Sequence, residues 1–136
     1  MPEPLGTLTP AQYEIMEVAW DAGEPGATVA EIWQAIGRRR SITRTTVLNL
    51  VDRLQKRGWL SRHQPDGTYR YVPTIDRETA TRQLAREFVD EFFDGSASDL
   101  VLSLLGPGKC KPSEVERLRS LLDQATARRK HKGTRS

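Results

Sequence analysis

Hydroxyl, guanidinium and amide groups gather near the start of one predicted helix, which extends from Thr43 to about Arg57 and is stopped by Gly58. Its first turn reads Thr43-Arg44-Thr45-Thr46, and Asn49 follows one turn later. Hydroxyl and guanidinium groups bind phosphates and base edges, and asparagine can form two hydrogen bonds with an adenine. The amino terminus of a helix also favours a phosphate, because its first backbone N–H groups are unpaired. These residue types predict a DNA-binding helix.

Further candidate DNA contacts lie on both sides of this first turn. Arg53 and Lys56 are too far along the helix to reach base edges, so we expect them to contact the DNA backbone. Tyr69 and Arg70 belong to a predicted hairpin and are placed to reach flanking phosphate or the minor groove. The full candidate set is Arg40, Thr43, Arg44, Thr45, Thr46, Asn49, Arg53, Lys56, Tyr69 and Arg70.

Each candidate also has a purely structural alternative. Thr43 can cap its helix with or without DNA, Arg53 can pair with the acidic first helix, and Tyr69 can pack the hairpin on the core. The distribution of charge favours DNA binding for the set as a whole. The 136-residue chain has 21 Lys+Arg against 18 Asp+Glu, yet residues 38–75 alone hold 9 basic and 2 acidic side chains. Such a positive block is typical of a surface that binds a polyanion.

The elements around the candidate helix follow an informative order. Thr9 and Thr28 each open a capping box and so begin a helix, and Gly23 and Gly37 are placed to end these two helices. Two segments rich in aromatic and β-branched residues then flank a turn that contains Pro65 and Asp66-Gly67, which predicts a hairpin. The predicted elements are helices 9–22, 28–37 and 43–57 and strands 59–63 and 68–72, with a basic loop at 38–40.

This order predicts a fold that is mainly α with a small β-hairpin wing. Residues 1–75 would form a winged helix-turn-helix DNA-binding domain, and residues 76–125 a helical dimerisation domain. In the second domain, caps at Asp76, Ser96 and Ser113 predict three helices. Residues 126–136 form a basic tail without apolar periodicity, which we expect to be disordered.

The carboxy-terminal helices are too short to bury their apolar faces on one another alone. We therefore expect a two-fold homodimer, since symmetric dimers dominate soluble oligomers. The alternative is that these helices fold back onto the winged domain of their own chain. The predicted dimer contacts are Leu84, Phe88, Phe92, Leu100, Val101, Leu104, Leu118, Leu121 and Leu122.

Enzyme and metal chemistry are not predicted. His63, His131 and Cys110 are scattered, so neither a nucleophile with its base nor a closely spaced ligand pair can be identified. We therefore expect no catalytic residue, no metal and no cofactor. The longest apolar run, residues 100–105, is far shorter than a membrane-spanning helix, so no membrane insertion is expected. The single cysteine and the lack of a signal-peptide pattern favour the cytoplasm.

Several segments together carry a resemblance to a known family. They are Leu8-Thr9-Pro10-Ala11-Gln12-Tyr13-Glu14-Ile15-Met16 through Trp20, Thr28-Val29-Ala30-Glu31-Ile32, Thr45-Thr46-Val47-Leu48 through Arg53-Leu54, Lys56-Arg57-Gly58, Tyr69-Arg70-Tyr71 and Phe93-Asp94-Gly95-Ser96. In this order and spacing, residues 8 to about 125 resemble the penicillinase repressor family of the BlaI/MecI/CopY type. The resemblance implies a bacterial cytoplasmic repressor, dimeric on inverted-repeat operators.

The resemblance also implies two ways of releasing the repressor. In the antibiotic-resistance branch, a membrane sensor-protease pathway cuts an Asn-Phe bond, which would fall here at Ser103-Leu104. In the copper-responsive branch, paired cysteines near the carboxy terminus bind metal, whereas Cys110 has no partner in the sequence. Both motifs depart from the family pattern.

Two other functions are compatible with the same elements. A ligand-sensing winged-helix regulator would hold a small molecule in a cleft beside the dimer helices, but no convergent polar groups in the sequence require such a cleft. A winged-helix module that binds protein rather than DNA has no need for the positive block, although an acidic partner could use it.

Overall fold

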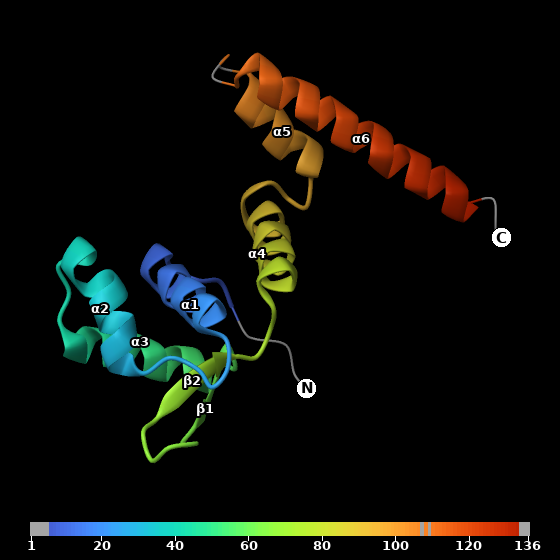
Figure 1. Ribbon diagram of the computed structural model, residues 1–136. Coiled ribbons are helices and arrows are strands. Elements are labelled where there is room, and N and C mark those ends of the chain that lie inside the picture. The colour runs from blue at the N-terminus through green and yellow to red at the C-terminus, as the bar shows by residue number, and fades with distance from the viewer. Residues whose placement is uncertain (1–5, 107, 109, 134–136) are drawn as a thin grey trace. The chain divides into compact units, whose positions relative to one another are not determined.

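The computed structural model describes residues 6–106, 108 and 110–133. In these ranges the chain is mainly α-helical with a single β-hairpin, as predicted (Figure 1). The elements are α1 (Pro10–Ala22), α2 (Val29–Arg40), α3 (Arg44–Lys56), β1 (Leu60–His63), β2 (Arg70–Pro73), α4 (Arg77–Phe92), α5 (Ala97–Leu105) and α6 (Pro112–Gly133).

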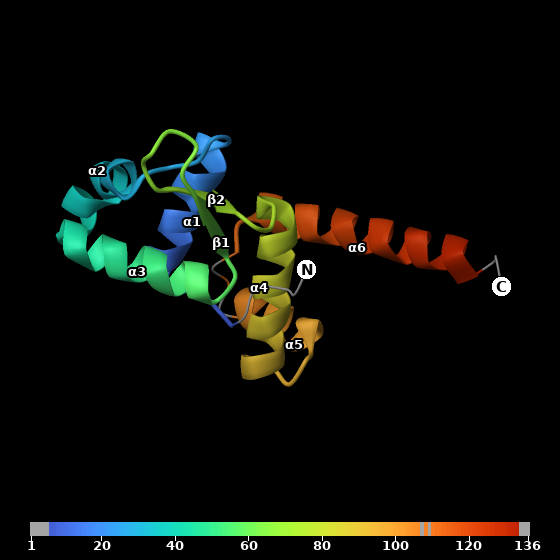
Figure 2. The same ribbon diagram turned by 90° about the horizontal axis from the view of Figure 1, so that it is seen from below.

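The chain divides into two compact units, one up to Glu87 and one from Phe88 onwards, so the division lies within α4. The first unit contains α1, α2, α3 and the hairpin, with α2 against α3 and α1 against α2, α3 and β2 (Figure 2). This is the order and packing of a winged helix-turn-helix. The first part of α4 belongs to it as well, because Ala80 is fully buried in its core.

Local capping explains why the first helices begin where they do. Thr9 accepts a hydrogen bond from the Gln12 backbone N–H at 3.2 Å, and the Gln12 side chain accepts one from the Thr9 N–H at 3.0 Å. Thr28 and Glu31 repeat this arrangement at the start of α2, at 3.1 and 2.9 Å. Both predicted capping boxes are confirmed, and each satisfies backbone donors that a helix leaves unpaired.

The predicted end of α2 at Gly37 is wrong. The helix continues to Arg40, and Ser41 ends it in the left-handed conformation with φ 53°. Gly37 lies within the helix, where its lack of a side chain makes room for the Trp33 indole: a Cβ at Gly37 would be 2.5 Å from the Trp33 ring. Residues 38–40 therefore form the last helical turn rather than a loop. Their positive charges interact favourably with the negative end of the helix dipole.

One continuous core joins the elements of the first unit. Its residues follow helical spacing on α1 and α3, whereas Trp33 of α2 is 36% exposed. The hairpin contributes Trp59, Leu60 and Tyr71. The buried residues are Ile15, Met16, Ala19, Ala27, Ile32, Ile36, Val47, Val51, Leu54, Trp59, Leu60, Tyr71 and Ala80.

The hairpin is held against the loop that precedes α2. Its strands pair antiparallel with Leu60 opposite Pro73 and His63 opposite Arg70. Ala27 forms an isolated antiparallel β-bridge to β2, because it exchanges two backbone hydrogen bonds with Tyr71, at 3.0 and 2.9 Å. Gly26 permits this approach, since a Cβ there would lie 2.8 Å from the Tyr71 carbonyl oxygen.

The second unit contains the end of α4, α5 and α6. Ser96 caps α5 by accepting from the Asp99 N–H at 3.1 Å, as predicted. The predicted cap at Ser113 is wrong: α6 begins at Pro112, a residue type suited to the first helical position. The predicted end near residue 125 is also wrong, since α6 reaches Gly133. Residues 125–129 include two alanines and two arginines, which favour a helix without needing an apolar face.

Candidate nucleic-acid interface

Packing fixes which face of α3 is exposed. Val47, Val51 and Leu54 are fully buried, so the opposite side of the helix is turned to solvent. That side carries the predicted polar and basic residues, and none of them is drawn into the core. The exposed residues are Arg44, Thr45, Thr46, Leu48, Asn49, Arg53 and Lys56.

The first turn of α3 is organised by threonine hydroxyls. The Thr43 hydroxyl accepts a hydrogen bond from the Thr46 N–H at 3.1 Å and so caps the helix. The Thr43 and Thr46 hydroxyls also lie 3.1 Å apart and bond to each other. The Thr45 hydroxyl forms no such hydrogen bond among the described residues, and Thr45 is exposed. The helix terminus thus presents exposed hydroxyls beside unpaired backbone donors, an arrangement suited to an anion.

The remaining groups of this face differ in how freely they can meet a ligand. The side chains of Arg44, Asn49 and Arg53 have no hydrogen-bond or ion-pair partner among the described residues. Lys56 pairs with Asp52 at 3.0 Å one turn earlier, but both side chains are exposed. Such surface pairs are weak and screened by salt, so Lys56 can exchange Asp52 for a phosphate.

Arg40 forms an ion pair with a residue of α1. Its Nε donates to Oε2 of Glu14 on α1 at 2.7 Å, and Arg39 contacts the same oxygen at 3.1 Å. The hydrogen bond from Arg40 is the main reason that the pKa of Glu14 lies below its ordinary value. Of the candidates from the sequence, Arg40 is therefore the one that the structure places against α1.

Arg70 is likewise held within the wing. Its guanidinium donates to Oδ2 of Asp66 at 3.0 Å from Nη2, to the Gly26 carbonyl at 3.2 Å, and to Glu31 at 3.4 Å. The bond from Arg70 holds the pKa of Asp66 below its ordinary value. The Arg70 side chain is only 22% exposed.

Arg62 was not among the residues predicted from the sequence. It lies on β1 with its guanidinium carbon 4.4 Å from the centre of the Tyr69 ring, within the range of a cation–π contact. Both side chains are exposed. The sequence patterns do not single out Arg62. The observed register of the hairpin pairs Arg62 with Tyr71, which places Tyr69 on the diagonal.

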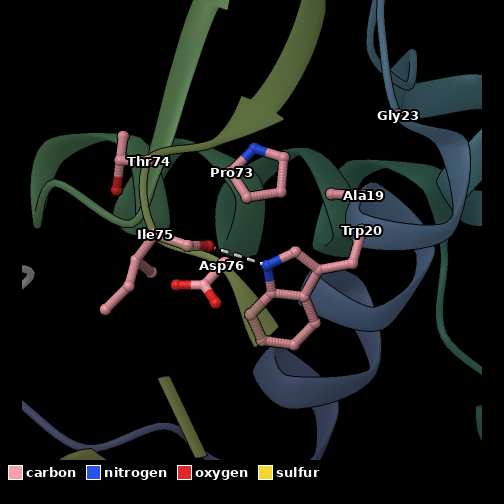
Figure 3. A pocket seen from close by; sticks show the side chains of 7 residues that line it. All are labelled: Ala19, Trp20, Gly23, Pro73, Thr74, Ile75 and Asp76. Carbon is pink, nitrogen blue, oxygen red and sulfur yellow. Dashed lines mark hydrogen bonds between the residues drawn. The ribbon is translucent and has the colours of Figure 1, made fainter. Parts of the chain in front are cut away.

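A shallow depression lies where α1 ends and α4 begins (Figure 3). The Trp20 indole N–H donates to the Ile75 carbonyl at 2.8 Å and forms part of its wall. Its one carboxylate, Asp76, already bonds to Thr79, which lowers the pKa of Asp76. The depression has a volume of about 290 Å³ and is lined by Ala19, Trp20, Gly23, Pro73, Thr74, Ile75 and Asp76.

The predicted dimer contacts occupy two kinds of position. Leu84 packs against the core of the first unit. In the second unit Phe92 is 64% exposed and Leu122 is 61% exposed, and Leu102, which was not predicted, is 67% exposed. Phe88, Leu104 and Leu121 are also exposed, and the partly buried members are Leu100, Val101 and Leu118.

The predicted cleavage bond, Ser103-Leu104, lies in α5, and both residues are exposed. Among the described residues no group of three or more His, Cys, Asp or Glu could hold a metal ion. Within the same ranges, no helix combines the length and apolar character needed to cross a bilayer.

Comparison with known proteins identifies the family. The family described as penicillinase repressor matches residues 8–124. The penicillinase repressor of Bacillus licheniformis is 23% identical over 123 residues, covering 90% of this chain and 94% of that protein. The transcriptional regulator BlaI of Mycobacterium tuberculosis is 31% identical over 74 residues, covering 54% of this chain and 53% of that protein.

Among solved structures, the Bacillus licheniformis BlaI monomeric form in complex with the blaP half-operator aligns with a TM-score of 0.47 and 23% identity. It covers 57% of this chain and 92% of that chain. The family match spans most of the chain, from the first helix of the winged unit into α6, and it is a family of repressors, not of enzymes. This chain belongs to the penicillinase repressor family.

Proposed function

We propose that this protein is a transcriptional repressor that binds double-stranded DNA through the exposed face of α3. The observation that carries the proposal is that the side chains of Arg44, Asn49 and Arg53 on this face have no partner among the described residues. They follow a helix terminus that is capped by Thr43. Membership in the penicillinase repressor family supports the same function. A repressor of this kind acts where the chromosome lies, which we expect to be the cytoplasm.

The side chains of α3 would divide the work of recognition. Near the helix start, Thr45 and Asn49 are suited to base edges in the major groove, with Asn49 able to bond an adenine at two positions. Arg44 can serve a guanine or a phosphate. Arg53 and Lys56 lie two and three turns along the helix and are suited to the DNA backbone, which supplies affinity without sequence preference.

Homodimerisation is the second part of the proposal. The second unit exposes large apolar side chains on α4, α5 and α6, which another copy of the chain would bury. A two-fold dimer would place two α3 helices in successive major grooves of an inverted repeat, with half-sites about 10 bp or a multiple of that apart. Each copy would then read one half-site.

Proteolysis in α5 is the proposed route of release. A cut at Ser103-Leu104 would separate α6 from the winged unit and so remove part of the dimer surface. Because a protease binds an extended chain, α5 would have to open locally before the cut. A membrane sensor-protease pathway is the expected partner. Mass spectrometry of the repressor recovered during derepression tests this, since the fragment must end at Ser103.

The DNA-binding proposal is tested by selection from a pool of random duplexes at several salt concentrations. Enrichment of an inverted repeat would support a dimeric repressor, and affinity should fall steeply with salt because phosphate contacts release counterions. Binding without enrichment would contradict base readout by α3. Failure to bind at low salt would contradict the whole proposal and favour a protein partner.

A further inference from the structure

The wing has two arginines, and only one of them is available to a phosphate. Arg70 directs four hydrogen bonds at Asp66, Glu31 and the Gly26 carbonyl, out of the five N–H donors that a guanidinium has. Two carboxylates also offset its single positive charge. A phosphate approaching Arg70 would meet a neutralised group whose donors are already in use.

The partners of Arg70 show what it does instead. Glu31 belongs to the capping box that starts α2, and Gly26 precedes Ala27, which pairs with Tyr71. His63 reaches the same loop through a 2.7 Å hydrogen bond between Nε2 and the Pro25 carbonyl. These contacts fasten both strands of the wing to the segment before α2, so the wing is docked before any DNA arrives.

Arg62 is in the opposite situation. Its contact is the Tyr69 ring, and it has no carboxylate partner among the described residues. A guanidinium over an aromatic ring is held in place, while the N–H groups at its edge remain free to bond a phosphate. Arg62 is therefore an ordered, uncompensated cation on a wing that is already fixed.

We infer that Arg62, supported by Tyr69, is the wing residue that binds a DNA phosphate, and that Arg70 is a positioning residue that docks the wing. The assignment rests on the proposed function and adds to it a contact that the sequence patterns did not indicate. It also moves the predicted wing contact from Arg70 on β2 to Arg62 on β1.

The test measures how the affinity for one selected operator depends on salt. The variants are Arg62→Gln, Arg70→Gln and the double variant, with Arg82→Gln as the matched control. Arg82 is exposed on α4 and pairs with Glu78, so its replacement removes the same charge outside the wing. Thermal unfolding of each variant is recorded alongside.

Loss of one phosphate contact reduces the slope of log K against log[salt] by about 0.9, so a dimer that loses one contact in each copy should show a reduction of about 1.8. We expect this reduction for Arg62→Gln, with an unchanged Tm, and no reduction for Arg82→Gln. Arg70→Gln should lower the Tm, and in the Arg62→Gln background it should leave the slope unchanged, because Arg70 acts only through the position of the wing.

Two results would overturn the assignment. One is an Arg62→Gln slope equal to that of Arg82→Gln. The other is a further reduction of about 1.8, that is about 0.9 for each copy in the dimer, when Arg70→Gln is added to Arg62→Gln, since Arg70 would then hold a phosphate itself. A wild-type protein that does not bind duplex DNA would overturn the proposed function, and this assignment with it, so the two failures are distinguishable.

Discussion

Arg40 donates from Nε to Oε2 of Glu14 at 2.7 Å, which ties the last turn of α2 to α1. The two residues are 26 positions apart in the sequence, and Arg40 is one of the DNA contacts predicted from the sequence. Arg39 reaches the same carboxylate, so Glu14 gathers two of the three arginines in this turn. The basic turn thus contributes to the packing of the helix-turn-helix.

This ion pair predicts a specific dependence of stability on pH. The pKa of Glu14 in the folded state lies below its ordinary value of 4.5, so the stabilisation is present above pH 4.5 and is lost as the pH falls through the folded-state pKa. Glu14→Gln should lower the Tm at pH 7, and the difference from the wild type should shrink towards pH 3. Thermal unfolding across this range measures both curves.

The difference in Tm between the wild type and Glu14→Gln isolates the contribution of Glu14. Glu31, Asp66 and Asp76 also have lowered pKa values, but they are present in both proteins and shift both curves alike. A Tm difference that stays constant from pH 7 to pH 3 would show that the Glu14 carboxylate is not stabilised by its arginines.

The effect of Gly37→Ala on stability should change sign with the residue at position 33. Gly37→Ala should destabilise the first unit by about 1–3 kcal/mol, because the added Cβ would lie 2.5 Å from an indole that is held by a hydrogen bond to the Ile42 carbonyl. In a Trp33→Ala background the same substitution should stabilise by up to about 1 kcal/mol, since alanine favours a helix more than glycine does. Chemical denaturation of the four proteins gives both values. An equal cost in both backgrounds would rule out the steric explanation.

The proposed homodimer predicts that Leu122→Glu produces monomers. Leu122 is largely exposed on α6, and a charge buried at a two-fold interface acts twice, so the dissociation constant should rise on the order of 100-fold or more. Gln124→Glu is the control, because it adds the same charge to an exposed polar position of the same helix. Sedimentation equilibrium reports the mass of each. A wild-type protein that is monomeric at micromolar concentration would contradict the proposed dimer.

Features that depend on neighbouring residues in the chain could be predicted from the sequence. The capping boxes at Thr9 and Thr28 and the cap at Thr43 involve groups three residues apart, so residue types alone identify them. The buried stripe of α3 follows from its spacing, and it left the polar face exposed as expected. The candidate DNA-binding face on α3 was therefore visible before the structure.

Features that depend on tertiary contacts could not be predicted in this way. Gly37 has the residue type of a helix stop, but its role is to make room for Trp33. Arg70 and Arg62 are both wing arginines, and only the fold shows that the first meets Glu31, 39 positions away, while the second meets Tyr69. The charges can be counted from the sequence, whereas only the structure shows which of them are paired.

Readout of base edges by α3 is tested most directly by Asn49→Ala. The measurement is the ratio of affinities for the selected operator and a scrambled duplex, at one salt concentration. Loss of a two-bond adenine contact costs about 1–3 kcal/mol of discrimination, so the ratio should fall roughly tenfold or more. Lys56→Ala should weaken both duplexes equally and leave the ratio unchanged. An Asn49→Ala protein that keeps the wild-type ratio would contradict the account, because α3 would then not be the element that reads the sequence.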